Sequence, residues 1–168
     1  MKIFTLIFIA LCIPALGFCQ EITGLWKGTM YNDSTQKSLP YELYIVKENG
    51  KYAGYTHSWF LVNGKEYYGI KKVKVRVAKD GKVVIQDASL IENNYPVPPD
   101  NVSQLNVLDL ANSGADASMD GPFVTNRTKT YTELTGRINV KRSMTLTNSV
   151  LMDYLAKSGI ETNLTVSK

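Results

Sequence analysis

Apolar and polar side chains alternate along much of the middle of this chain. The clearest run covers residues 71 to 86, KKVKVRVAKDGKVVIQ. One face holds Val73, Val75 and Val77, and the other holds Lys72, Lys74 and Arg76. Because side chains alternate between the two faces of a strand, this pattern predicts a β-strand whose valines face inward. We interpret the basic stripe as a solvated outer face that discourages edge pairing, in preference to a docking surface for an acidic partner.

Three dipeptides separate the alternating runs: Asn49-Gly50, Asn63-Gly64 and Asp80-Gly81. They favour the positive φ angles of two-residue hairpin turns, so residues 41 to 90 are expected to form four antiparallel strands. The turns lie 14 and 17 residues apart, whereas a sandwich of short strands is expected to turn about every 8 to 12 residues. Long strands joined by tight turns favour an up-and-down barrel.

Four further strands are predicted: an opening strand from Gly24, then residues 104 to 110, 117 to 124 and 130 to 142. About eight strands is the number at which a closed barrel can hold one small ligand. We therefore expect an all-β protein in which residues 20 to 142 form one antiparallel up-and-down β-barrel. Residues 143 to 168 are expected to form a short C-terminal α-helix and a tail.

The expected helix has recognisable ends. Thr147 is the predicted N-cap, Gly159 takes the left-handed position after the helix, and Ile160 supplies the accompanying hydrophobic contact. Its apolar stripe comprises Val150, Leu151, Tyr154 and Leu155. We expect this stripe to lie against the barrel wall, because the polar face is not rich enough in cations for a membrane-surface helix.

The first predicted strand begins with Gly24-Leu25-Trp26, and Arg142 lies near the end of the last strand, on the same face as its apolar residues. Closure of an antiparallel barrel would make Trp26 and Arg142 neighbours. In these features the sequence resembles the lipocalin-like, calycin-type barrels, whose first strand begins with Gly-x-Trp and whose last strand carries an arginine packed on that tryptophan. The resemblance implies a closed barrel followed by a helix, with Trp26 and Arg142 as structural residues. Avidin-like barrels begin with a similar Thr-Gly-x-Trp, matched here by Thr23 to Trp26.

Trp26 has two interpretations, a platform for a ligand or a plug of the barrel. Burying about 200 Å² of indole at about 25 cal/mol/Å² stabilises a fold by several kcal/mol, whereas a guanidinium stacked on the ring contributes about 0.5 to 2 kcal/mol. We therefore predict that Trp26 is a structural plug.

The N-terminal segment MKIFTLIFIALCIPALGFCQ is typical of a secretory signal peptide. Its apolar run, residues 3 to 16, is shorter than the roughly 20 residues that span a bilayer. We expect cleavage after Cys19, removal of residues 1 to 19, no stable membrane insertion afterwards, and a periplasmic or extracellular protein. Lipidation of Cys19 is the alternative, although the bulky Phe18 departs from that pattern.

The exported part lacks the residues of several chemistries. Cys12 and Cys19 are the only cysteines, so no intrachain disulfide can form after cleavage, and His57 is the only histidine, so no histidine-rich or cysteine-based metal site is expected. Removal of the signal lowers the net charge from +4 to +3. This charge is much smaller than that of a typical nucleic-acid-binding domain. No phosphate loop, dinucleotide fingerprint or hydrolase motif is present, and residues 34 to 37 match Ser-x-x-Lys only within a turn. We therefore expect no cofactor and no catalytic residue, and interpret the protein as a non-enzyme.

The exported part is rich in tyrosine, which suits a partly wet pocket but is also a common strand residue. In the densest aromatic group, Tyr55, His57 and Trp59 share one face of a strand, and a hairpin brings Tyr68 beside them. If this face points inward, these four residues line a ligand pocket, and if it points outward, they form an exposed aromatic patch.

Two functions follow from these alternatives. The first is an exported binding module that holds a small, partly apolar ligand, lined by Tyr55, His57, Trp59 and Tyr68. The second is a non-enzymatic interaction protein of the cell envelope with a filled barrel. It would contact a protein partner through the proline-rich loop NNYPVPPD, residues 93 to 100.

Overall fold

The computed structural model describes residues 21–97 and 100–160. Its strands are β1 (Gly24–Asn32), β2 (Lys37–Glu48), β3 (Lys51–Val62), β4 (Lys65–Val77), β5 (Val83–Asn93), β6 (Gln104–Ala111), β7 (Ser118–Thr125) and β8 (Thr135–Ser143). A short 3-10 helix, η1 (Gly114–Asp116), precedes β7, and an α-helix, α1 (Val150–Lys157), follows β8. The predicted signal peptide, including Cys19, lies outside the described residues.

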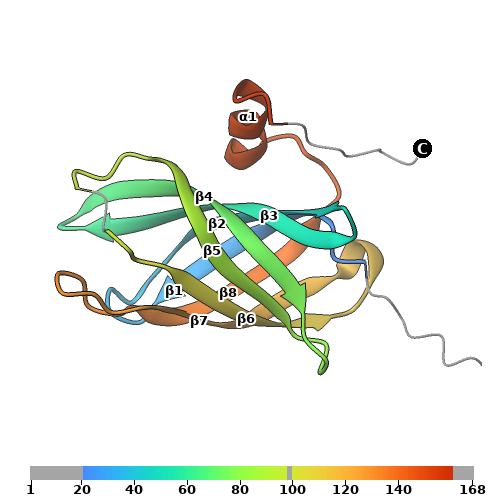
Figure 1. Ribbon diagram of the computed structural model, residues 1–168, viewed down its shortest axis with the longest axis horizontal. Helices are drawn as coiled ribbons and strands as arrows, with labels where there is room; N and C mark the ends of the chain where they lie inside the picture. The colour runs from blue at the N-terminus through green and yellow to red at the C-terminus, as the bar shows by residue number, and fades with distance from the viewer. Residues whose placement is uncertain (1–20, 98–99, 161–168) are drawn as a thin grey trace, which may run out of the picture.

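The eight strands form one closed barrel (Figure 1). Each strand pairs antiparallel with the next along the chain, and β8 pairs with β1 to close the sheet. The expected all-β, up-and-down barrel with one short helix after it is therefore confirmed. The helix α1 lies outside the barrel, against its wall (Figure 1).

Two of the three predicted tight turns have the expected geometry. Asn49-Gly50 and Asn63-Gly64 each have two consecutive positive φ angles, which suit the right-handed twist of the flanking strands. At Asp80-Gly81 only the glycine has a positive φ. There the Gly81 N–H donates to the Ala78 carbonyl, so the β4–β5 connection is a longer turn that ends in a left-handed glycine.

The last strand begins later than predicted. The backbone N–H of Leu134 donates to the side-chain oxygen of Thr125 at 2.7 Å, and β8 starts only at Thr135. Tyr131, which was expected in this strand, therefore lies in the β7–β8 connection. That connection places Tyr131 in the wall of the cavity described below.

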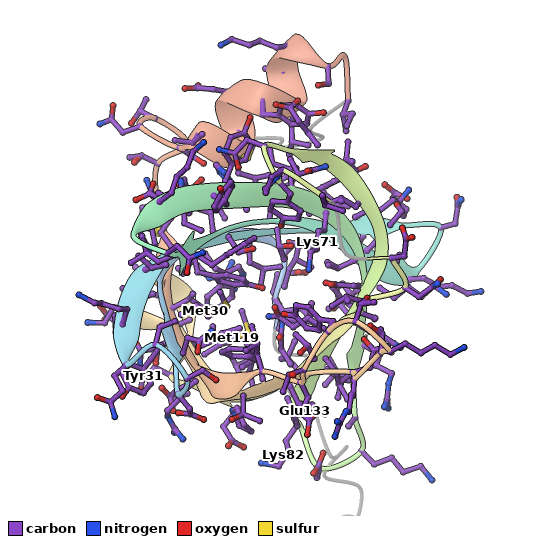
Figure 2. The ribbon with its side chains drawn as sticks, turned by 90° about the vertical axis from the view of Figure 1, so that its left-hand side faces the viewer. Met30, Tyr31, Lys71, Lys82, Met119 and Glu133 are labelled. Carbon is purple, nitrogen blue, oxygen red and sulfur yellow. The ribbon has the colours of Figure 1, made fainter. Side chains whose placement is uncertain are left out.

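The end of the barrel at which β1 begins is filled with apolar side chains. This core includes Ile22, Trp26, Leu43, Ile45, Val73, Val75, Val83, Ile85, Leu108, Met119, Ile138 and Val140. Met30 and Met119 point into the barrel in Figure 2, whereas Tyr31 points away from it, as strand alternation requires. Val73 and Val75 face inward as predicted, but Val77 is exposed at the end of its strand.

Trp26 lies at the base of this core with its side chain fully buried, 0% exposed. The register of β1 and β8 places it opposite Arg142, whose guanidinium carbon lies 4.6 Å from the centre of the indole system. The indole N–H donates to the Ile22 carbonyl at 3.0 Å, and the Arg142 guanidinium donates to the carbonyls of Thr23 and Glu21. These bonds fold the segment before β1 across the base of the barrel.

The helix α1 is fastened to the barrel through a carboxylate. Glu42 of β2 is 5% exposed, and its Oε2 atom accepts from the Leu151 backbone N–H at 2.8 Å and from the Ser149 hydroxyl at 3.1 Å. Ser149 itself is the N-cap, in place of the predicted Thr147, because its oxygen accepts from the Met152 N–H. A carboxylate at this position also suits the positive end of the helix dipole.

The packed face of α1 shares Leu151 and Leu155 with the predicted stripe, and the partly buried Tyr154 packs against the same cluster. Leu151, Met152 and Leu155 are buried against the barrel wall, whereas Val150 is exposed. The helix ends as predicted at Gly159, where the Ile160 N–H donates to the Leu155 carbonyl. No helix in the described part of the chain is both long and apolar enough to cross a membrane.

The clasp at the base of the barrel predicts a non-additive pair of substitutions. Trp26→Ala should lower the free energy of unfolding by about 3 to 5 kcal/mol, the range for large buried aromatic residues. Arg142→Met should also destabilise, and the double variant should lose less than the sum because both residues share one interaction. Denaturant unfolding followed by Trp59 fluorescence measures all three, with Arg76→Met, at an exposed position on β4, as the control. If Trp26→Ala unfolded at nearly the same denaturant concentration as the parent, the interpretation of Trp26 as a structural plug would be wrong.

The carboxylate cap predicts that α1 depends on one barrel residue. Glu42→Gln should destabilise the protein by about 1 to 3 kcal/mol, because buried N–H and O–H groups lose a charged acceptor. Amide hydrogen exchange in α1 should accelerate more than exchange in the strands. Glu48→Gln, an exposed carboxylate on the same strand, is the matched control and should leave both measurements unchanged.

Candidate functional site

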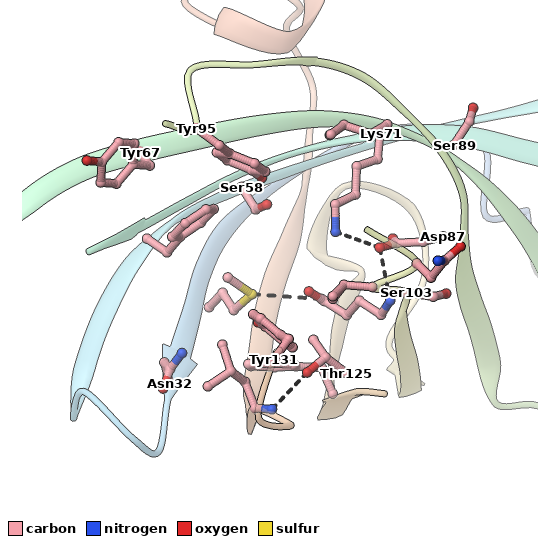
Figure 3. A pocket seen from close by; sticks show the side chains of 18 of the residues that line it. Asn32, Ser58, Tyr67, Lys71, Asp87, Ser89, Tyr95, Ser103, Thr125 and Tyr131 are labelled. Carbon is pink, nitrogen blue, oxygen red and sulfur yellow. Dashed lines mark hydrogen bonds and ion pairs between the residues drawn. The ribbon is translucent and has the colours of Figure 1, made fainter. Parts of the chain in front are cut away.

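A cavity of about 510 Å³ occupies the barrel end opposite Trp26 (Figure 3). Its walls come from the end of β1, the second half of β3, the first half of β4, the second half of β5, the start of β6 and the end of β7. The β5–β6 and β7–β8 connections complete them. The barrel is therefore plugged at one end and hollow at the other.

Small residues on β3 and β4 explain why this end is hollow. Ser58 and Gly69 are register partners that face the interior, where the opposite end carries leucine, isoleucine and valine. A Cβ at Gly69 would lie 2.0 Å from the Tyr95 hydroxyl oxygen, so the phenol of Tyr95 occupies the space that a side chain would fill. Tyr95, a residue of the β5–β6 connection, thus forms part of the cavity wall in place of a strand side chain.

Aromatic rings form this side of the cavity. The ring centre of Phe60 lies 6.2 Å from that of Tyr67 and 4.9 Å from that of Tyr95. Phe123 and Tyr131 also line the cavity. Burial is the main cause of the raised pKa of the Tyr95 phenol, and nearby Asp87 adds to it, so this group is uncharged near neutral pH. Flat faces with polar tips suit a partly apolar ligand.

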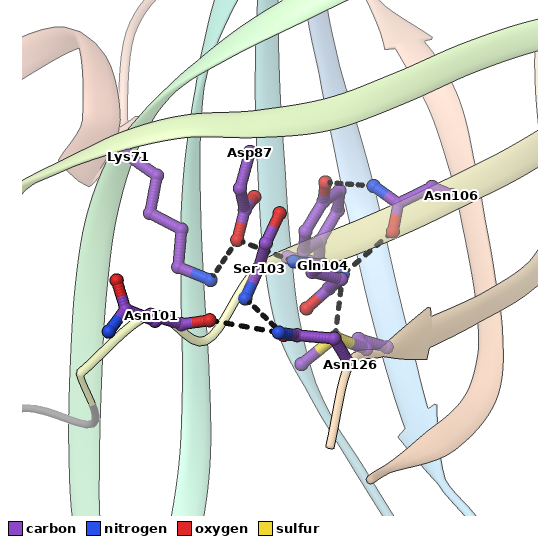
Figure 4. A network of polar contacts seen from close by, with 9 residues as sticks. Lys71, Asp87, Asn101, Ser103, Gln104, Asn106 and Asn126 are labelled. Carbon is purple, nitrogen blue, oxygen red and sulfur yellow. Dashed lines mark hydrogen bonds and ion pairs between the residues drawn. The ribbon is translucent and has the colours of Figure 1, made fainter. Parts of the chain in front are cut away.

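An ion pair lies within the cavity wall (Figures 3 and 4). Lys71 Nζ is 2.5 Å from Asp87 Oδ2, and the two side chains are only 17% and 12% exposed. The same Asp87 oxygen accepts from the Gln104 backbone N–H at 2.9 Å. Paired charges tolerate burial because each offsets the desolvation of the other.

Amide side chains extend this polar wall toward the core. Gln104 Nε2 donates to Asn106 Oδ1 at 2.8 Å, and Asn106 Nδ2 donates to the Tyr41 hydroxyl at 3.2 Å. Burial, with a contribution from the charge of Asp87, raises the pKa of Tyr41, so its phenol also stays protonated. The network fixes the orientation of the residues next to the ion pair.

The mouth of the cavity is held by hydrogen bonds between the Asn126 side chain and the backbone. Asn126, in the β7–β8 connection, accepts from the Ser103 N–H at 2.7 Å and donates to the Asn101 carbonyl at 2.9 Å (Figure 4). These contacts tie the β5–β6 connection to the β7–β8 connection. The predicted interaction loop, residues 93 to 100, therefore belongs in part to the cavity wall, through Tyr95, Pro96 and Val97.

Strand alternation contained a signal for the ion pair. Lys71 shares its parity with the buried Val73 and Val75, and Asp87 shares its parity with Val83 and Ile85. A lysine and an aspartate at inward positions of neighbouring strands predict a buried pair, which the sequence reasoning above missed. Beyond Asp87, two register shifts between β4 and β5 break the alternation, so the position of Leu90 in the cavity wall was not readable from the sequence.

The four predicted lining residues, Tyr55, His57, Trp59 and Tyr68, lie on the outer face of the barrel. Thr56 and Ser58 occupy the alternate positions of β3, and their register partners on β2 and β4 face the interior. Of the two predicted orientations, the aromatic face therefore has the outward one, and these four residues do not line the cavity. The residues are grouped as predicted, and Tyr55 and Tyr68 pack in the cluster beneath α1.

His57 is buried on this outer face, 2% exposed. Its ring centre lies 3.7 Å from that of Trp59 and 5.3 Å from that of Tyr68. Neither ring nitrogen has a hydrogen-bond partner among the described residues. Burial lowers the pKa of His57 to about 4, against an opposing influence from Glu92, so the imidazole is neutral at pH 7.

In comparisons with known proteins, no protein-family model, curated protein or solved structure matches the chain significantly. Within residues 21–97 and 100–160, no three His, Cys, Asp or Glu side chains gather where they could hold a metal ion. The chemistry of the cavity therefore rests on the residues that line it.

The buried imidazole predicts a pH dependence of stability. The pKa of His57 falls from 6.5 to about 4 on folding, so between these values the unfolded chain binds the proton more tightly and stability decreases as the pH falls. His57→Leu should remove this contribution. Denaturant unfolding at pH 7, 5.5 and 4.5 should show a steeper loss for the parent than for the variant. Glu42 and Glu92 are present in both proteins, so their titration affects both equally. If stability fell with pH to the same extent in the parent and in the variant, His57 would not be a buried, neutral group.

Proposed function

We propose that this protein is an exported binding module that holds one small, partly apolar molecule inside its barrel. The observation that carries the proposal is the cavity of about 510 Å³ at one end of an otherwise packed barrel. Protein interiors are close-packed, so a hollow of this size is a cost to stability unless a ligand uses it.

The size of the cavity supports a small organic ligand. Its volume is far larger than a single water molecule requires. It also falls inside the roughly 300 to 1,000 Å³ that is usual for small-molecule sites. The opposite end of the barrel is closed by Trp26 and its neighbours, so the ligand would enter and leave between the β5–β6 and β7–β8 connections.

The lining supports an amphipathic ligand. Aromatic and aliphatic side chains provide most of the wall, and one ion pair with adjacent amides provides a fixed polar point. Binding sites combine such apolar walls with a few placed polar groups that set orientation. Among the described residues that line the cavity, no hydroxyl donates a hydrogen bond to Lys71 or Asp87, and we therefore propose binding without catalysis.

Membership of the lipocalin-like barrels is part of the proposal. It is supported by Gly24-Leu25-Trp26 at the start of β1, by the stacking of Arg142 on Trp26, and by the helix after the barrel. Export rests on the signal-like character of residues 1 to 19. The alternative of an envelope interaction protein assumed a filled barrel, and the cavity favours the binding module.

A substitution that fills the cavity tests the proposal. Ser58→Trp would place an indole in the hollow, so it should weaken binding of the uncharged fluorescent probe N-phenyl-1-naphthylamine by roughly tenfold or more, equivalent to about 1.4 kcal/mol. A fluorescence titration gives both dissociation constants. Native mass spectrometry of the parent protein should also detect a co-purified small molecule, which the variant should lack.

The matched control is Ser38→Trp, the same change at an exposed position on the outer face of β2. It should bind the probe as the parent does. Equal probe binding by Ser58→Trp and the parent, with both proteins folded, would show that the cavity is not the binding site. A parent protein that binds no probe would overturn the proposed function itself.

A further inference from the structure

A contribution to stability does not by itself explain the position of the ion pair between Lys71 and Asp87. Both side chains are nearly buried, and their 2.5 Å contact lies in the wall of a cavity. Buried ion pairs generally contribute little net stability, because desolvation offsets their attraction. A role toward the contents of the cavity explains why charged residues stand at these two inward positions.

The pair retains unused hydrogen-bonding capacity. An ammonium group has three donors, and the one contact of Lys71 Nζ in the described part of the chain is to Asp87 Oδ2. Oδ2 of Asp87 accepts from Lys71 and from Gln104, whereas no contact in residues 21–97 and 100–160 engages Oδ1. The site therefore offers donors and an acceptor side by side.

The charge of the site is balanced. Lys71 and Asp87 are the only charged residues among those that line the cavity in the described chain, and their charges cancel. The neighbouring polar side chains, Gln104 and Asn106, are uncharged amides. A ligand with a net charge would bring an uncompensated charge into a poorly hydrated space, which is costly.

On the basis of the proposed binding function, we propose that the ligand carries one uncharged group with an acceptor and a donor side by side. A carboxamide is the simplest such group. It would accept from Lys71 and donate to Asp87 without disturbing their contact. The apolar body of the ligand would then lie along the rings of Phe60, Tyr67 and Tyr95, which line the same cavity.

Three naphthalene probes of nearly equal shape test this assignment: naphthalene-2-carboxamide, naphthalene-2-carboxylate and 2-acetylnaphthalene. The first has an acceptor and a donor, the second is an anion, and the third has only an acceptor. The exported protein should bind the carboxamide roughly tenfold to a hundredfold more tightly than the other two, because hydrogen bonds to charged groups are among the stronger ones. Calorimetric or fluorescence titration at pH 7 measures the three dissociation constants.

Charge-changing variants should alter the preference in opposite directions. Asp87→Asn leaves Lys71 uncompensated, so the carboxylate should become the tightest probe. Lys71→Met leaves Asp87 uncompensated, so carboxylate binding should be lost and the carboxamide should bind about tenfold more weakly. A merely structural ion pair would not reverse a ligand preference. If either single variant fails to fold, Lys71→Met combined with Asp87→Asn removes both charges and should lose most of the carboxamide preference.

N-phenyl-1-naphthylamine, which has no carboxamide, separates failure of this inference from failure of the proposed function. If the parent binds this probe but binds the three naphthalenes equally, or prefers the carboxylate or the ketone, the inference is overturned and the binding module remains. The same conclusion follows if Asp87→Asn keeps the preference of the parent. If the parent does not bind N-phenyl-1-naphthylamine at all, both proposals fail together.

Discussion

The pairing of β1 with β8 is the contact on which the rest of this structure depends. Once these strands pair, the sheet has no free edge, and the number of strands, eight, sets the diameter of the barrel. The same pairing sets Arg142 over Trp26 and folds residues 21 to 23 across the base. Closure therefore creates both the enclosed space and the plug at one of its ends.

The interior is divided by side-chain volume. Branched and aromatic residues fill the plugged end, whereas at the other end the small residues Ser58 and Gly69 leave room for the phenol of Tyr95 and for the cavity beside it. Tyr95 enters this space from a connection and is not part of a strand. A rigid, packed half thus supports a hollow half whose walls are partly loops, the usual arrangement when a scaffold positions a binding site.

Two buried carboxylates have different tasks in this arrangement. Glu42 faces outward, where it accepts from the Leu151 N–H at the start of α1 and pairs with Lys27 at 3.5 Å, and α1 packs on the outer aromatic face at Tyr55. Asp87 faces inward and holds Lys71 at the cavity wall. Each charge is buried only where a specific partner compensates it, as the cost of desolvation requires. The outer cluster beneath α1 contributes packing, and the inner pair contributes polarity to the cavity.

The sequence by itself determined the strands, the two Asn-Gly turns, the barrel class, the helix and the proximity of Trp26 to Arg142, because alternation, turn chemistry and strand order are local or follow from closure. It also grouped Tyr55, His57 and Trp59 on one face. Only the tertiary structure decided that this face is outside, since an apolar face can be buried by α1 as well as by the barrel interior. The register shifts beyond Asp87 and the placement of Tyr95 over Gly69 likewise depend on residues distant in sequence, and local alternation carries no information about how the volumes of such residues sum.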